Sequence, residues 1–423
     1  MKSKWEYKKI IDLAIKVGMG PFGSSIKVET FVPEGIPIVS GQHLHGNRLD
    51  EEPGFNYISK DHADRLISAN VYPGDVIFTH AGNISNVAYI PDVTKYKRYV
   101  ASQRQFFLRC DKKKLLPEFI TYYFKTHEGQ YKLKANSSSV GVPSIAQPVS
   151  YLKQLEVPVP PLPEQRAIAN VLSALDDKIE LNRRTNQTLE QLAQALFKHW
   201  FIDNPDREGW ESASLSTICD TQYGFTSSSS EEKVGPKFLR ITDMNKEPWI
   251  SWDRVPYCRI NEKDFEKYKL KTGDLLVSRM ADPGKAAIVD VDIDAVFASY
   301  LVRLKLHNKE LSYYIFYFLT SPEYVEYANG AMSGSVQSGM NARVITGVTL
   351  FIPPSHLIKK FNDRIRPIRQ KIQFNIDEIS TLAELRDTLL PKLMSGQVRV
   401  KPIVTTALDA NTDERLIEVN DEA

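Results

Sequence analysis

Residues 164–201 read EQRAIANVLSALDDKIELNRRTNQTLEQLAQALFKHWF. Apolar and amide side chains recur in this stretch at alternating steps of four and three residues, which is typical of the a/d seam of a coiled coil. The seam positions are Ile168, Leu172, Leu175, Ile179, Asn182, Asn186, Leu189, Ala193, Leu196 and Trp200. We therefore predict a helix of roughly 57 Å, at 1.5 Å per residue, that buries this seam against a partner helix.

A second seam follows at an offset of 193 residues. Its positions are Phe361, Ile365, Ile368, Ile372, Asn375, Ile379, Leu382, Arg386, Leu389 and Leu393. Two such helices in one chain can bury their seams against each other, so we predict an antiparallel coiled coil. Pro367 and Pro391 lie inside the second helix, and we expect a bend at each because proline removes a backbone donor.

Asn182 and Asn375 occupy the same step of the two seams. In an antiparallel pair the middle of one seam meets the middle of the other, near position 184, so these two residues are expected close to the crossing point. We predict that they hydrogen-bond each other and set the register of the helices, since a buried polar seam residue costs stability but specifies alignment.

The repeat continues outside the helices, in the same order in both halves. A series of shared motifs favours internal duplication far more than any single motif does. The matched pairs are Trp5-Glu6 with Trp210-Glu211, Pro73-Gly74-Asp75-Val76-Ile77 with Thr272-Gly273-Asp274-Leu275-Leu276, Ala101-Ser102 with Ala298-Ser299, and Val157-Pro158-Val159-Pro160-Pro161 with Phe351-Ile352-Pro353-Pro354.

Each globular half reads as mixed helix and strand. Short apolar runs bounded by Gly, Pro and Asn predict strands at 36–40, 76–79 and 104–109, and at 237–241, 275–278 and 301–306. Aromatic amphipathic helices are expected over 117–127 and 311–320. The predicted class is α+β, with these domains: 1–155, first globular domain; 156–203, first long helix; 204–350, second globular domain; 351–400, second long helix; and 401–423, a flexible acidic tail.

The net charge of +2 is unevenly distributed. Residues 1–155 hold 21 Lys and Arg against 14 Asp and Glu, a balance of +7, whereas residues 204–350 hold 17 against 20, a balance of −3. The first half therefore has the balance of a polyanion binder, and the second does not. Three irregularly spaced cysteines, Cys110, Cys219 and Cys258, predict neither a disulfide framework nor a zinc site. With no signal peptide and no membrane-length apolar run, we expect a cytoplasmic protein.

Signals of catalysis are weak throughout. The sequence has no phosphate-binding P-loop, and His43 and His45 have no third metal ligand nearby, so exposed loop histidines are expected there. A loose nuclease-like pattern joins Pro205-Asp206 to Glu231-Glu232-Lys233, but the first half has no equivalent. We therefore predict no catalytic residue and no metal site in this chain.

Binding to nucleic acid is the remaining interpretation. Basic, amide and imidazole side chains in loops can donate hydrogen bonds to phosphates and base edges. The candidates in the first half are Lys27, His80, Asn83, Lys95, Lys97, Arg98, Arg104, Lys132 and Lys134. Those in the second half are Arg240, Arg279, Lys285, Gln337 and Arg343.

The segment Pro158-Val159-Pro160-Pro161-Leu162-Pro163-Glu164-Gln165-Arg166-Ala167-Ile168 resembles the start of a conserved helical region in one family. That family is the specificity subunits of type I restriction–modification enzymes. The ending Leu389-Leu390-Pro391-Lys392-Leu393-Met394-Ser395-Gly396 is similar to the close of its second helix, and the domain–helix–domain–helix order matches over essentially the whole chain. The second copy departs from the pattern because Leu357-Ile358 stand where the first copy has Glu-Gln.

The resemblance implies two target recognition domains that bind double-stranded DNA, each reading one half of a bipartite asymmetric sequence, with the paired helices setting their spacing. It also implies that catalysis belongs to partners: two modification subunits that use S-adenosylmethionine to methylate adenine, and restriction subunits that use ATP and Mg²⁺.

Three alternatives stay open at this point. The chain could serve a system that only methylates and has no nuclease partner. It could be a coiled-coil scaffold whose globular ends bind proteins, which the −3 balance of the second half favours. It could also be a metal-dependent nuclease acting through Asp206 and Glu231.

Overall fold

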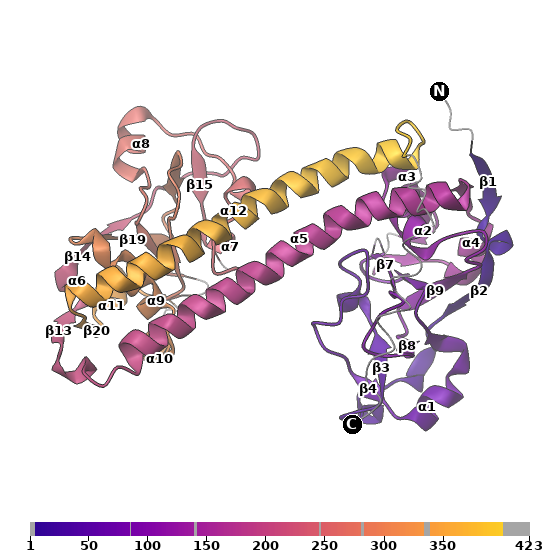
Figure 1. The fold of residues 1–423 in the computed structure, drawn as a ribbon, viewed down its shortest axis with the longest axis horizontal. Coiled ribbons are helices and arrows are strands. Elements are labelled where there is room, and N and C mark those ends of the chain that lie inside the picture. The colour runs from indigo at the N-terminus through magenta and orange to yellow at the C-terminus, as the bar shows by residue number, and fades with distance from the viewer. Residues whose placement is uncertain are drawn as a thin grey trace, which may run out of the picture. The chain divides into compact units, whose positions relative to one another are not determined.

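The structure is a computed structural model that describes residues 5–84, 86–138, 142–244, 247–280, 283–333 and 339–400 (Figure 1). The chain forms two compact units. Unit 1 comprises the chain up to Asp176 together with residues from Ala383 onward, and unit 2 comprises Asp177–Leu382. The division falls inside both long helices, so each unit contains part of each. The predicted acidic tail, 401–423, lies outside the described residues.

Unit 1 is built on a four-stranded antiparallel sheet of order β2-β9-β6-β7, beside a second sheet of order β4-β3-β8-β5. A ribbon of β1 and β12 brings the two ends of the globular part together. The elements are β1 (Glu6–Lys9), β2 (Ala14–Met19), β3 (Ile36–Val39), β4 (Tyr57–Ile58), α1 (Lys60–Arg65), β5 (Asn70–Val71), β6 (Asp75–Thr79), β7 (Val87–Tyr89), β8 (Tyr99–Ala101), β9 (Gln105–Cys110), α2 (Pro117–Tyr123), α3 (His127–Lys134), β10 (Ser137–Ser138), β11 (Ser144–Ile145), α4 (Pro148–Gln154) and β12 (Glu156–Val159).

The central strands of unit 1 are apolar on both faces because both faces are covered. Val76 and Phe78 of β6 pack into the core beneath α2, whereas Ile77 between them packs into a second core toward β8. Alternate residues of a strand point to opposite faces, so this single run supplies both cores. Three consecutive apolar residues at 76–78 are therefore expected for a strand that is buried on both faces.

Unit 2 repeats this plan with the sheet β14-β19-β16-β17, the parallel pair β15-β18 and the ribbon β13-β20. Its elements are β13 (Glu211–Ser214), α6 (Leu215–Ile218), β14 (Cys219–Tyr223), β15 (Lys237–Leu239), α7 (Ile241–Met244), α8 (Glu262–Tyr268), β16 (Leu275–Ser278), β17 (Ala286–Ile288), β18 (Ala295–Phe297), β19 (Leu301–Leu306), α9 (Ser312–Leu319), α10 (Pro322–Ser333), α11 (Ala342–Thr346) and β20 (Thr349–Ile352).

The common topology confirms the internal duplication but corrects one matched motif. The Ser102 amide donates to the Val39 carbonyl, and the Ala298 amide donates to the Leu239 carbonyl at the same place in unit 2, both at 2.9 Å. Ser102 therefore corresponds to Ala298, not to Ser299. The Ala-Ser dipeptide occurs in both halves one register step apart, which a comparison of letters alone does not reveal.

The long helices are α5 (Leu162–Phe197), which continues into a π-helical turn at Lys198–Ile202, and α12 (Ser355–Met394). Within unit 2 they lie side by side in opposite directions (Figure 1). Phe197 near the end of α5 packs on Phe361 near the start of α12, with ring centroids 6.2 Å apart. In unit 1, Ile168 of α5 and Leu393 of α12 share one core. None of the twenty predicted seam positions is exposed.

The predicted hydrogen bond between Asn182 and Asn375 is wrong, although both side chains are buried. The Asn375 amide donates instead to Asn186 Oδ1 at 2.8 Å, and the Asn182 amide donates to Glu378 Oε2 at 2.8 Å. The seam midpoints still face each other, because position 186 opposite 375 corresponds to position 184 opposite 377. Two asparagines at the same step of antiparallel seams are instead offset by four positions, so Asn375 meets Asn186 and not Asn182. The α12 helix is assigned without interruption through Pro367 and Pro391, and the bends expected there stay a prediction.

The described residues also test the predictions made for one helix, for the cysteines and for membrane spans. The helix predicted over 117–127 ends at Tyr123 as α2, and a separate helix, α3, begins at His127. The three cysteines are buried and free. Across the described ranges, no helix has the length and apolar character required to cross a membrane.

Candidate nucleic-acid interface

One end of the four-stranded sheet in unit 1 is marked by Gly20, directly after β2. A Cβ at this position would lie 1.8 Å from the carbonyl oxygen of Ser102, so only glycine lets the two backbones approach so closely. The Gly20 amide donates to the carbonyl of Gln105, the first residue of β9, at 2.8 Å. We call this the glycine end of the sheet: β2 and β6 end here, and β7 and β9 begin here.

Four loops meet at the glycine end of unit 1 through backbone and amide hydrogen bonds. The His80 amide, after β6, donates to the carbonyl of Arg104, before β9, at 2.9 Å. The Gly82 amide donates to Pro143 at 2.9 Å, and the Gln103 side chain donates to Ile26 at 3.2 Å. Loops that are distant in sequence therefore form one connected surface.

The side chains at this end include several of the predicted candidates. Lys27, Asn83 and Arg104 are exposed, and His80 is half-buried with Nε2 2.9 Å from the Gln103 carbonyl oxygen. Two cations, an amide and an imidazole on one connected surface can contact both phosphates and base edges.

Unit 2 builds its glycine end in the same way around Gly224. A Cβ there would lie 2.2 Å from the carbonyl oxygen of Ala298. The Arg279 amide donates to the Tyr300 carbonyl at 3.0 Å, as His80 donates to Arg104 in unit 1. Arg279 therefore takes the structural place of His80. The same backbone frame presents a different side chain in each unit.

Arg279 is held against an aromatic ring. Its guanidinium carbon lies 4.9 Å from the ring centre of Tyr223, and the Tyr223 hydroxyl accepts a hydrogen bond from the Ala342 amide at 3.0 Å. Buried Nε of Arg279 has no hydrogen-bond partner within the described part of the chain. Arg343, the next residue after Ala342, is exposed. A planar cation lying over a tyrosine ring is suited to bidentate recognition of a phosphate or a guanine edge.

Other predicted candidates lie elsewhere or have intramolecular partners. Lys95, Lys97 and Arg98 precede β8, at the opposite end of that strand from Ser102. The Arg98 guanidinium pairs with Asp64 at 2.7 Å. Lys132 pairs with Glu128 at 2.9 Å and also donates to the carbonyl of Glu156.

Arg240 lies near the glycine end of unit 2 but already has an intramolecular ion-pair partner. Its guanidinium pairs with Asp243 at 2.9 Å, and this hydrogen bond raises the pKa of Arg240 above its ordinary value. Lys285 is half-buried directly before β17, and Lys134 is exposed at the end of α3, close before β10. Gln337 lies outside the described residues.

Exposed aromatic and apolar side chains at the glycine ends were not predicted. Phe22 is 76% exposed, Tyr300 59%, Tyr223 42% and Met280 38%. Flat rings beside basic groups can pack on sugars or bases, so they belong to the candidate surface. A sequence signal did exist for one of them, because Tyr223-Gly224 repeats the strand-end pattern of Met19-Gly20, but its exposure could not be read from the letters.

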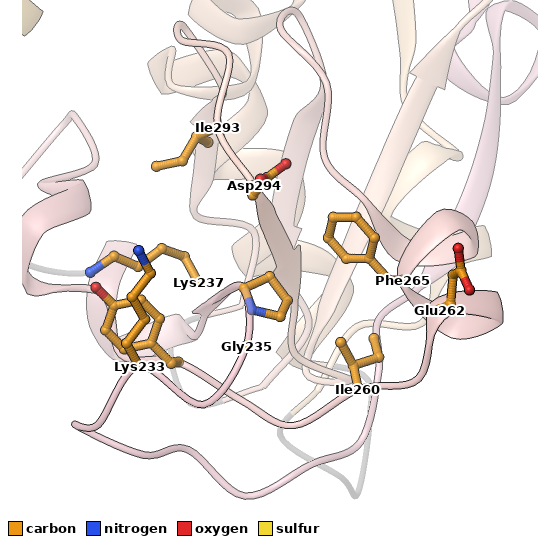
Figure 2. A pocket seen from close by; sticks show the side chains of 10 residues that line it. Lys233, Gly235, Lys237, Ile260, Glu262, Phe265, Ile293 and Asp294 are labelled. Atoms are coloured by element: carbon orange, nitrogen blue, oxygen red, sulfur yellow. The ribbon is translucent and has the colours of Figure 1, made fainter.

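A shallow hollow in unit 2, of about 610 Å³, is a weaker candidate. Figure 2 places Lys237 and Glu262 on opposite sides of it, with Phe265 between them. Lys237 Nζ already donates to the carbonyls of Asp253 and Val255, at 3.1 and 2.7 Å. Asp294 is paired with Lys269 at 3.0 Å. Two of the four charged side chains that line the hollow therefore already have intramolecular partners.

Of the two loop histidines predicted to be exposed, His45 is exposed and His43 is not. His43 is buried rather than exposed: its Nδ1 accepts from the Ser40 amide at 2.9 Å, and its ring stacks on Phe55. Burial lowers the pKa of His43. The described ranges contain no group of three or more His, Cys, Asp or Glu side chains placed to hold a metal ion.

Comparison with known proteins assigns the family. Residues 2–191 and 207–379 both match the model of the type I restriction modification DNA specificity domain, so the chain belongs to that family and contains the domain twice. The specificity subunit of the type I restriction enzyme MjaIX of Methanocaldococcus jannaschii is 27% identical, over 94% of this chain and 94% of its own length. That of the HindI enzyme of Haemophilus influenzae is 24% identical, over 77% and 86%.

The fold has a solved counterpart. The S subunit of a type I restriction–modification system from M. genitalium superposes with a TM-score of 0.62 at 18% identity, over 92% of this chain and 96% of that one. The duplicated α+β architecture with two long helices is therefore the specificity-subunit fold, as the sequence resemblance predicted. These relatives do not favour the nuclease alternative.

Proposed function

We propose that this chain is the DNA sequence-recognition subunit of a type I restriction–modification complex, and that each unit reads one half of a bipartite, asymmetric target through its glycine end. The observation that carries the proposal is the pair of equivalent glycine ends. Gly20 and Gly224 fix the same close backbone crossing, while the side chains presented there differ.

The difference between the two ends supports two different half-sites. Arg279 on Tyr223 occupies the place that His80 holds in unit 1. Arginine recognises the paired acceptors of guanine, whereas histidine offers one nitrogen donor or acceptor at a time. The +7 and −3 charge balances further imply that unit 1 depends more on phosphate contacts than unit 2 does.

The chain itself supplies recognition, and partners supply catalysis. Two modification subunits would bring S-adenosylmethionine and methylate adenine in each half-site, and restriction subunits would bring ATP- and Mg²⁺-dependent translocation and cleavage. The resemblance to specificity subunits carries this assignment of partners.

The test is single-molecule methylome sequencing of cells that express this chain with a neighbouring modification subunit. A new bipartite adenine mark, lost when this chain is deleted, is the expected outcome. A stable complex that produces no mark and does not retain duplex DNA would contradict the proposal. Challenge of the same cells with unmethylated DNA separates a restricting system from one that only methylates.

Single substitutions assign each half-site to a unit. Arg104→Ala should relax or lose one half-site, and Arg279→Ala the other, because base contacts specify sequence locally. Arg279→Lys keeps the charge and removes the planar fork, so a loss with this variant too identifies geometry as the cause. Lys113→Ala and Lys309→Ala, at exposed positions away from the glycine ends, are the matched controls and should leave both half-sites intact. A change in both half-sites by either arginine variant would contradict the assignment.

A further inference from the structure

One position of the helix repeat holds a carboxylate in the first copy and a guanidinium in the second. Asp176 of α5 and Arg369 of α12 are separated by the repeat offset of 193 residues, so they occupy equivalent positions. Each is paired with an oppositely charged residue on the other helix. We call these two ion pairs the clasps: Asp176–Arg386 in unit 1 and Glu190–Arg369 in unit 2.

The clasp in unit 1 is partly exposed. Arg386 Nη1 lies 2.8 Å from Asp176 Oδ1, and the two side chains are 28% and 21% exposed. The hydroxyl of Tyr122, from α2, donates to the other carboxylate oxygen of Asp176 at 2.6 Å. Asp176 thus joins the helix pair to the recognition domain of unit 1.

The clasp in unit 2 is buried. Arg369 Nη1 lies 3.0 Å from Glu190 Oε2, with the side chains 2% and 5% exposed, and Arg369 also pairs with Asp290. Burial alone would lower the pKa of Arg369, but Asp290, Tyr317 and Glu190 raise it above its ordinary value. The guanidinium therefore stays charged, and a buried charge that loses its partner is strongly destabilising.

We infer that the two clasps make α5 and α12 a heterospecific pair, in which the first half of the chain binds the second half and rejects another copy of itself. Position 369 faces Glu190, and position 176 is its equivalent, so two α5 helices in the same antiparallel register would set Asp176 against Glu190 twice. Position 176 faces Arg386, so two α12 helices would set Arg369 against Arg386 twice. A pair of two first halves and a pair of two second halves (the like-half pairs) would each place like charges together. Only the pair of a first half with a second half is complementary in charge.

The seam amides act in the same direction for the second half. The Asn375 amide donates to Asn186 Oδ1, and both side chains are fully buried. The equivalent of Asn186 in the second copy is Ile379. In a pair of α12 helices the Asn375 amide would face an alkyl side chain and lose its acceptor, which penalises that pairing.

The test uses the full-length chain with a protease site inserted between the exposed residues Glu208 and Gly209 and cut after folding. Two preparations with different tags are mixed, exchanged in mild denaturant, returned to native buffer and weighed by native mass spectrometry. The expected products are mixed first-half–second-half pairs, with like-half pairs below about a tenth of the total. Like-half pairs at about half of all pairs, the random proportion, would overturn the inference.

Arg386→Glu tests the charges directly. It turns the like-charged contact of a second-half pair into two opposite-charged contacts with Arg369, and it sets the new carboxylate at position 386 against Asp176 in the mixed pair. Second-half pairs should therefore rise about tenfold at the expense of mixed pairs. Arg364→Glu makes the same charge change on an exposed position of α12 and should have no effect. An equal rise with Arg364→Glu, or no rise with Arg386→Glu, rejects the charge mechanism. If the Arg386→Glu chain fails to fold, Arg386→Gln removes the repulsion alone and should give an intermediate rise.

Discussion

Gly20 and Gly224 determine where the recognition loops lie, although glycine has no side chain that could make a contact. At both sites a backbone carbonyl fills the space that a Cβ would need. Both glycines follow the first strand of the four-stranded sheet, and both amides bond to the first residue of the neighbouring strand. The position of Arg104 or Tyr300 relative to the sheet thus depends on the absence of one methyl group.

We expect Gly20→Ala to lower the free energy of unfolding of unit 1 by about 1–3 kcal/mol, because the Ser102 carbonyl has to move to admit the methyl group. Hydrogen exchange of the β9 amides and chemical denaturation would measure the loss. Gly41→Ala is the matched control, since its Cβ would lie 3.8 Å from Gln105 Nε2, an ordinary contact. Equal stability of the two variants would show that the close crossing is not required.

Lys125 predicts a dependence of stability on pH. Its Nζ donates to the Gly46 carbonyl at 2.6 Å, and burial lowers its pKa from 10.5 to about 8. Between about pH 8 and 10.5 the unfolded chain retains a proton that the folded chain has released, so this group makes stability rise with pH. Lys125→Met should remove that rise, by up to about 1.4 kcal/mol per pH unit.

The comparison of wild type with Lys125→Met across this pH window isolates the effect. The tyrosines of unit 1 titrate in both proteins, so their contribution cancels in the difference. Two stability curves that stay parallel from pH 8 to pH 10 would show that Lys125 remains charged in the folded protein.

At the scale of elements, Gln165 explains why the first long helix begins differently from the second. Its side chain is fully buried, donates to the carbonyls of Lys114 and Pro160 at 2.9 and 2.8 Å, and accepts from the Leu116 amide at 2.8 Å. It thereby joins the first turn of α5 to the start of α2. The equivalent residue in the second copy is Ile358, which is packed in an apolar core.

Gln165→Ile, which copies the second half, should destabilise unit 1 by about 2 kcal/mol because it leaves three backbone groups without their hydrogen-bond partner, at least one of them buried. Chemical denaturation against Gln187→Ile, an exposed position on the same helix, measures the specific loss. An unchanged midpoint for Gln165→Ile would mean that the Glu-Gln motif has no structural role at this position.

The elements with strong local patterns were predictable from the sequence, and those set by tertiary contacts were not. The strands at 275–278 and 301–306 have the predicted bounds. The predicted helix at 117–127 is divided because Thr126 caps a new helix by accepting from the Gly129 amide, and a Cβ on Gly129 would lie 2.2 Å from the Tyr123 carbonyl oxygen. A tight crossing of this kind leaves no periodic signal.

The seam and the candidate site show the same limit. The heptad steps correctly predicted which faces are buried, but residues at the same step of two antiparallel helices are offset unless that step is the midpoint, so Asn186 rather than Asn182 is the partner of Asn375. Charge and loop composition selected Arg104 and Arg279, but could not distinguish them from Arg98, whose carboxylate partner lies 34 residues earlier. Pairing is a property of the folded chain, so it becomes visible only in three dimensions.

For the whole molecule, the long helices predict the spacing of the target. Removing one heptad from both α5 and α12 shortens each by about 10 Å, or about three base pairs of duplex. The spacer between the half-sites should change, while both half-sites keep their sequence. Methylome sequencing of the shortened chain measures both the spacer and the half-sites, and an unaltered spacer would show that helix length does not set the spacing. Removal from one helix alone should instead break the clasps and abolish the mark.

The ribbons at the base of each recognition domain have a consequence for inheritance. Glu6 pairs with Val159, and Glu211 pairs with Ile352, so each domain leaves its ribbon and returns to it at one place. Two crossovers in the gene, one at each strand of a ribbon, exchange an entire domain while both helices and their clasps remain. A lineage can therefore acquire a new half-target in one recombination event, without passing through intermediates that recognise nothing.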